Sequence, residues 1–166
     1  ESIMWNELGT NADYEKELAL LSEMSDNDKY ELLCQIGYCC DIIKNNFGEN
    51  SKWKWSFVEL EGRYATVAKN FIDMKTAGRD FMDPRSFDYE TTVLYIRLIT
   101  KLLNSAATSY RDKYELATRR IDDMRNAIKY LLALHKLHNL LGQGDQAQEV
   151  KKKALIWKDK MDADHK

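Results

Sequence analysis

The side chains best suited to bind a metal ion are two histidines and a group of cysteines. His135 and His138 are three positions apart, so a helix would place them on the same side. The cysteines are Cys34, Cys39 and Cys40. Structural zinc sites use four such ligands at short, recurring spacings, and no such spacing occurs here. We therefore expect no metal and no other cofactor, and interpret the cysteines as reduced thiols that fill a helical core.

Sequence motifs for catalysis are also missing. The chain contains no glycine-rich phosphate loop, no nucleophile elbow and no Glu-x-x-His pair of the kind that binds di-iron centres in helical bundles. Glu59 and Glu61 flank a predicted apolar face without partners of that type. We expect a protein that is not an enzyme.

The composition limits both the possible folds and the possible classes of binding partner. The 166-residue chain is 44% hydrophobic and 31% charged, which suits a single helical domain over residues 1–166. Seven glycines and one proline are too few for the turns of a β-sandwich or barrel. The net charge of -2 argues against nucleic acid as a partner. No apolar run reaches the roughly 18–20 residues of a membrane span, so we expect no span. The cysteines, interpreted as reduced thiols, predict a reducing, cytoplasmic location.

Helix caps and glycines divide the chain into about six helices, which predicts an all-α, antiparallel bundle. The first helix is short, at about Ala12 to Met24 within residues 1–24, and carries Tyr14, Leu18 and Leu21 on one stripe. The others are expected at about residues 26–47, 51–77, 88–103, 109–141 and 145–166. The last of these is a candidate for a peripheral position.

Two of the predicted helices carry apolar residues spaced alternately by three and four positions. In the third helix these are Phe57, Leu60, Tyr64, Val67, Phe71 and Met74, and in the fifth they are Tyr110, Tyr114, Ala117, Ile121, Met124, Ile128 and Leu131. Such seams pack helices at shallow angles, in a closed bundle, in a short solenoid or between copies of a chain. The fourth helix is apolar nearly all round and belongs at the centre.

Aromatic residues give the best candidates for contact with a partner. Trp53 and Trp55 alternate with lysines at the start of the third helix, where both indoles cannot easily face the core. The alternative is that both lie under the loop at residues 48–51. Tyr38, on the second helix, is a further candidate.

One segment resembles a known family. Glu31 to Ile43, which includes Leu-Leu-Cys-Gln and Cys-Cys-Asp, resembles the second-helix region of poxviral Bcl-2-like inhibitors of apoptosis. That resemblance implies a small helical bundle whose hydrophobic groove binds an amphipathic BH3-type helix. The stretch from Leu137 to Leu155 is similar to a single tetratricopeptide-like hairpin.

These observations favour a non-enzymatic interaction module that binds a partner helix or a subunit face, with Trp53, Trp55 and Tyr38 as contact residues. A structural protein that self-associates through its heptad faces is the alternative, and an inhibitor of apoptosis that binds BH3 helices is a further one. The partner is therefore another protein or a second copy of the chain.

Overall fold

The computed structural model describes residues 24–48 and 52–165, and this part of the chain is all-α, as expected. The helices are α2 (Asp26–Phe47), α3 (Lys54–Phe71), α4 (Met74–Met82), α5 (Tyr89–Lys113), α6 (Ile121–Leu140) and α7 (Gly144–Asp164), with a π-helical turn, η1 (Tyr114–Thr118), after α5. The first helix expected from the sequence, at residues 12–24, lies almost entirely outside the described residues. None of the described helices is long and apolar enough to cross a membrane.

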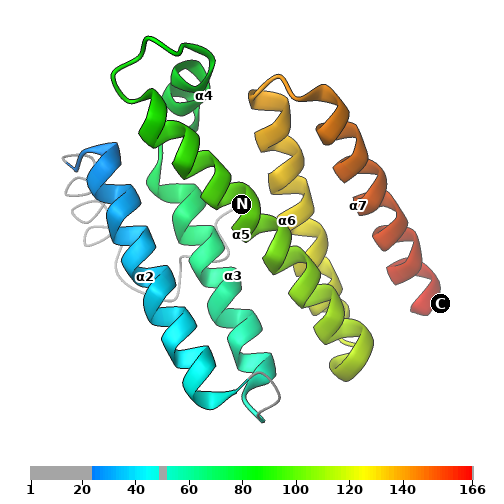
Figure 1. Ribbon diagram of the computed structural model, residues 1–166. Coiled ribbons are helices and arrows are strands. Elements are labelled where there is room, and N and C mark those ends of the chain that lie inside the picture. Colours follow the sequence, from blue (N-terminus) through cyan, green and yellow to red (C-terminus); the bar gives the residue numbers. More distant parts are fainter. Residues whose placement is uncertain (1–23, 49–51, 166) are drawn as a thin grey trace, which may run out of the picture.

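The five long helices lie side by side in the order α2, α3, α5, α6, α7, and successive ones run in opposite directions (Figure 1). Helix α5 contacts α2, α3, α4 and α6. Its residues Tyr95, Ile99 and Leu103 are fully or almost fully buried. The central position expected for the fourth helix is therefore confirmed, and α7 lies at one end of the array, against α6.

The third predicted helix is interrupted, so the expected continuous helix over residues 51–77 is wrong. Helix α3 ends at Phe71, and Ile72 is extended and buried. The side chain of Asp73 then caps α4, because it accepts hydrogen bonds from the Lys75 amide at 3.1 Å and the Thr76 hydroxyl at 2.7 Å. A new helix therefore starts at Met74 in a different direction.

The boundary between the fourth and fifth predicted helices also differs from the expectation. Helix α5 continues to Lys113 because Ala106 and Ala107 are fully buried, and packing outweighs the weak helix propensity of the surrounding Asn, Ser and Thr residues. The turn comes instead at Arg119, whose φ of 51° is left-handed. The Thr118 hydroxyl donates to Asp123 at 2.6 Å and braces this turn.

Helix α7 is held on the array by Trp157 and by a charged network. The indole is buried, with the Arg111 guanidinium 5.1 Å from its ring centre. Glu115 accepts hydrogen bonds from Arg111 at 2.8 Å and Lys160 at 2.7 Å. The apolar stripe of this helix faces the array, and its members are buried or half-buried (Ala147, Val150, Ala154, Trp157 and Met161).

Candidate functional site

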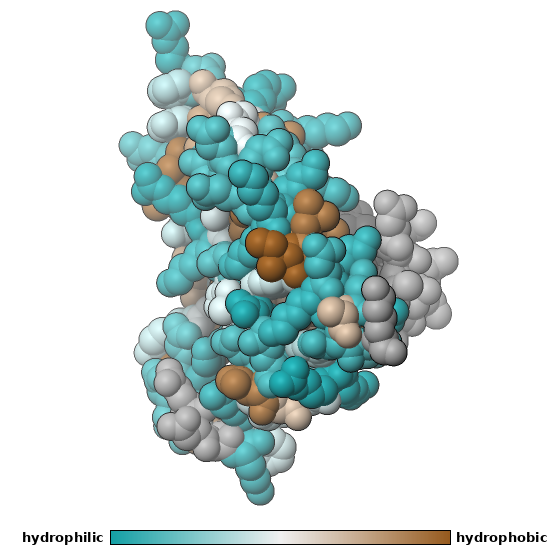
Figure 2. All heavy atoms as spheres, turned by 90° about the vertical axis from the view of Figure 1, so that its right-hand side faces the viewer, coloured by the Kyte–Doolittle hydropathy of each residue, from teal (hydrophilic) through white to brown (hydrophobic). Residues whose placement is uncertain are grey.

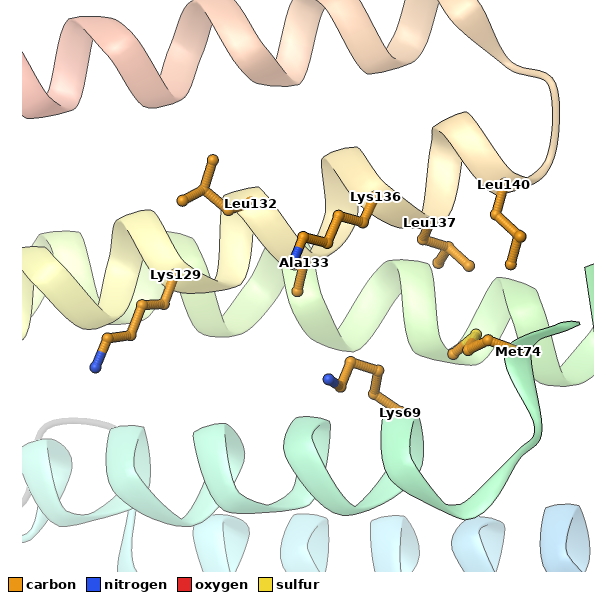
Figure 3. A pocket seen from close by; sticks show the side chains of 8 residues that line it. All are labelled: Lys69, Met74, Lys129, Leu132, Ala133, Lys136, Leu137 and Leu140. Carbon is orange, nitrogen blue, oxygen red and sulfur yellow. The ribbon is translucent and has the colours of Figure 1, made fainter. Parts of the chain in front are cut away.

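A lysine-lined apolar hollow of about 560 Å³ lies between α3, α4 and α6. Its lining residues are Lys69, Met74, Lys129, Leu132, Ala133, Lys136, Leu137 and Leu140. Figure 3 shows Lys69 and Met74 on one side of the space and the residues of α6 on the other, with the Lys69 and Lys129 side chains extending between the helices.

A second hollow of about 170 Å³ continues the first. It shares Lys69, Lys129 and Ala133 with it and adds Thr66, Leu103, Tyr110, Asn126 and Tyr130. Leu103 and Tyr110 belong to α5, which therefore forms the floor between the two walls. We call the two hollows together the α3–α6 groove.

The groove follows α6 from Asn126 to Leu140. These residues are 14 positions apart in one helix, so the groove is about 21 Å long at 1.5 Å per residue. An elongated, apolar space of this kind differs from the compact pockets that enclose small substrates. Its length suits an extended ligand.

Two close approaches between helices lie near the ends of the groove. Near one end, the Tyr130 hydroxyl on α6 donates to the Gly62 carbonyl oxygen on α3 at 2.8 Å. At the other end, Leu140 packs against Gly78 of α4 so closely that a Cβ there would lie 3.0 Å from the leucine Cγ. Between these contacts Ala133, whose side chain is short, lines both hollows.

The electrostatic character of the groove comes from three lysines. No ion pair within residues 24–48 and 52–165 involves Lys69, Lys129 or Lys136. Some lysines elsewhere do form ion pairs: Lys113 lies 2.8 Å from Glu59, and Lys160 lies 2.7 Å from Glu115. The groove therefore presents positive charge on both rims around an apolar floor.

The three contact residues proposed from the sequence lie outside this groove and are not brought together. Trp53 precedes α3 and is 46% exposed, with the Lys52 ammonium 5.1 Å from its ring centre. Trp55 is half-buried and packs against the core. Tyr38 is 68% exposed on α2, at the edge of a different hollow of about 450 Å³.

The residues considered for metal binding are dispersed. Cys40 is buried, but Cys34 and Cys39 are exposed, so the expectation that all three fill the core is wrong for two of them. The ring of His138 is buried and shares a hydrogen bond with the Gln143 side chain at 2.7 Å. Among the described side chains, no group of three His, Cys, Asp or Glu is placed to hold a metal ion.

The heptad seams proposed for self-association are used mainly inside the chain. Tyr64, Tyr110, Tyr114, Met124 and Leu131 are all buried. The exposed apolar residues of α7 are instead Leu155 and Ile156, at 51% and 66% exposure. Figure 2 looks onto the α7 side and shows a mainly hydrophilic surface with small hydrophobic patches.

The groove was not predicted from the sequence because each of its lysines, taken singly, has no unusual sequence context. Lys69 is 60 positions from Lys129 along the chain, and each occupies a position that usually faces solvent on an amphipathic helix. One feature of the sequence does set these lysines apart: none of the three has an acidic residue four positions before it. An acidic residue at that position forms the most favourable ion pair with a lysine on a helix.

A family model, described as the TP0443 family, matches residues 8–165, which is nearly the whole chain. The chain therefore belongs to the TP0443 family. No curated protein and no solved structure matches it.

Proposed function

We propose that this member of the TP0443 family is a non-enzymatic protein–protein interaction module that binds an acidic amphipathic helix in the α3–α6 groove. The observation that carries the proposal is the convergence of three lysines on one apolar groove, none of which forms an ion pair with another residue of the described ranges 24–48 and 52–165. Helices laid into apolar grooves are a recurrent mode of protein recognition.

The shape of the groove supports a helix as the ligand. Its length of about 21 Å corresponds to about four helical turns, or 14 residues. Met74, Leu137 and Leu140 form an apolar end that suits large aliphatic side chains, and the Met74 thioether adapts to their shape. A compact anion would fill only part of this length.

The charge of the groove supports an acidic ligand. Lys69 lies on one rim, and Lys129 and Lys136 lie on the other, so carboxylates on both flanks of an apolar stripe would find partners. Lysine stems cover apolar surface while their ammonium groups stay in water. Ion pairs at such a rim contribute chiefly to association rate and specificity, with about 0.2–1 kcal/mol for each pair.

The test is a selection from a displayed library of random helical peptides of about 16 residues, with the full chain as bait. We expect the enriched peptides to carry apolar residues at positions i, i+4 and i+7, flanked by Asp and Glu. An enriched set without acidic bias would contradict the proposal.

Charge reversal then locates the site. The triple variant Lys69→Glu, Lys129→Glu, Lys136→Glu should weaken binding of a selected peptide on the order of 10- to 100-fold by fluorescence anisotropy. The matched control is Lys151→Glu, Lys152→Glu, Lys158→Glu, which makes the same charge change at exposed positions of α7. Equal loss in both variants would mean that net charge, and not the groove, governs binding.

A further inference from the structure

The two ends of the α3–α6 groove differ in chemical character. Met74, Leu137 and Leu140 line one end, which we call the apolar end, and all three side chains are hydrophobic. The smaller hollow lies at the other end, which we call the polar end, and its lining includes the side chains of Thr66 and Asn126. A ligand meets different chemistry at each end, so the groove has a direction.

The positive charge of the groove is shifted toward its polar end. Figure 3 shows the side chains of Lys69, Lys129 and Lys136 all extending away from Leu140, in the direction that leads from Leu140 to Lys129. This direction follows from helix geometry, because side chains lean toward the N-terminus of a helix and both α3 and α6 run toward the apolar end. The three ammonium groups are therefore displaced from the apolar end.

The polar end offers hydrogen-bond donors to a ligand. The Thr66 and Tyr130 hydroxyls both donate to the Gly62 carbonyl oxygen, at 2.9 Å and 2.8 Å, so their protons are already used. The donors that remain in the lining are the lysine ammonium groups and the Asn126 amide, and neither hollow is lined by Asp or Glu. Such an end suits carboxylates and the last carbonyl groups of a helix, which have no partner within that helix.

The direction of the two walls favours the same arrangement. Helices α3 and α6 run parallel to each other, and α5 runs the opposite way (Figure 1). Their C-terminal ends, at Phe71 and Leu140, lie at the apolar end of the groove, where the helix dipoles place partial negative charge. The N-terminus of a bound helix carries partial positive charge, so it is favoured at this end.

We propose that the partner helix lies antiparallel to α3 and α6, with aliphatic side chains of its N-terminal half at the apolar end and carboxylates of its C-terminal half near Lys69 and Lys129. This inference deepens the proposed function and rests on it, because it assumes that the groove accepts an acidic amphipathic helix. Carboxylates near a C-terminus weaken an isolated helix, and the groove lysines offset this effect in the complex. The partner is therefore recognised by the order of its residues as well as by its composition.

The peptides selected from the random helical library provide the first test. We expect their Asp and Glu residues to be concentrated in the C-terminal half, after most of the apolar residues. Acidic residues concentrated in the N-terminal half, or spread evenly over both halves, would overturn the inference and leave the proposed function intact. A selected set without acidic bias would overturn both.

Spin labels then locate the two ends of a selected peptide on the full chain. A nitroxide on the C-terminus of the peptide should broaden the NMR signals of the Asn126 and Lys129 amides, and one on the N-terminus should broaden those of Met74 and Leu140. The opposite pattern, or equal broadening by both labels, would overturn the orientation and keep the groove as the site. Broadening confined to residues outside the groove, such as Tyr38, would overturn both.

A charge cycle tests whether the lysines receive the carboxylates. Changing the acidic residues in the C-terminal half of the peptide to amides should weaken its binding to the wild type by about 5-fold or more. This loss should largely disappear in Lys69→Gln, Lys129→Gln. It should persist in the matched control Lys75→Gln, Lys152→Gln, whose two lysines are exposed and line neither hollow. Equal losses in all three proteins would overturn the inference.

Discussion

The hydroxyl of Tyr130 on α6 donates a 2.8 Å hydrogen bond to the carbonyl oxygen of Gly62 on α3, and this contact is possible only because residue 62 lacks a side chain. A Cβ at Gly62 would lie 2.8 Å from the Tyr130 hydroxyl oxygen and 2.7 Å from the ring of Tyr110. The two tyrosine rings stack with their centres 5.7 Å apart. Helices α3 and α6 are thereby joined across α5, and the groove opens beyond this point.

Gly62→Ala should destabilise the fold by about 1–3 kcal/mol, since two buried tyrosines must move to admit one methyl group. Gly78→Ala is the matched control in α4. There the new Cβ meets Leu140, which is 41% exposed and free to rotate, and alanine favours the helix. We expect a change within about 1 kcal/mol for Gly78→Ala, measured by urea unfolding. If both variants lost a similar, large amount of unfolding free energy, the close approach of α3 and α6 at Gly62 would not be the more sensitive of the two contacts, and this prediction would be wrong.

Tyr64→Phe should remove a buried link between α3 and α2. The Tyr64 hydroxyl donates to the Leu33 carbonyl oxygen at 2.6 Å, and both residues are buried. The variant is expected to lower the free energy of unfolding by about 1 kcal/mol with little change in the circular dichroism spectrum. Tyr89→Phe, at a half-buried tyrosine at the start of α5, serves as the control and should be nearly neutral.

The pKa of Tyr64 adds a pH signature to this variant. Burial, followed by the charge of the nearby Cys34, raises the pKa to about 12 from an ordinary value of 10. A raised pKa contributes stability that is complete below pH 10 and is lost as the pH rises toward 12. The stability difference between wild type and Tyr64→Phe should therefore shrink over this interval. A constant difference up to pH 12 would be inconsistent with the burial of this hydroxyl.

Glu115 should make the attachment of α7 sensitive to acid. Hydrogen bonds from Lys160 and then Arg111 hold the pKa of Glu115 below its ordinary value of 4.5. Its contribution to stability is therefore present above pH 4.5 and is lost as the pH falls through the lowered pKa. Glu115→Gln should cost about 1 kcal/mol at pH 7, and the cost should decline below pH 4.5. Hydrogen exchange of α7 amides measures this, and an acid-independent effect of the substitution would argue against the network.

The two tryptophans at the start of α3 should respond differently to substitution. Trp55 packs against the core, so Trp55→Ala should destabilise the fold by about 2–3 kcal/mol. Trp53 is 46% exposed, and Trp53→Ala should cost less than about 1 kcal/mol. Neither lines the groove, so binding of a selected peptide should be unchanged in folded Trp53→Ala protein. Weaker binding in that variant would restore Trp53 as a contact residue, as proposed from the sequence.

The periodicity of apolar residues was enough to predict most of the helices and many of the side chains that they bury. Tyr110, Met124 and Leu131 are buried, as their spacing on the fifth predicted helix indicated, and Tyr64 is buried on the seam of the third. Such patterns are local: a period of about 3.6 residues gathers apolar side chains on one face whatever that face packs against. For the same reason, an all-α chain with a central apolar helix was predictable.

The positions at which the helices break, and the groove that their surfaces form together, depend on how the helices pack against one another. The turn at Arg119 replaces the expected break near residue 106 because burial of Ala106 and Ala107 extends α5, and that burial depends on neighbouring helices. Lys69 and Lys129 face one groove only because Gly62 allows α3 to approach α6. A contact between residues 60 or more positions apart leaves no periodic trace in the sequence, so the groove depends on how the helices pack.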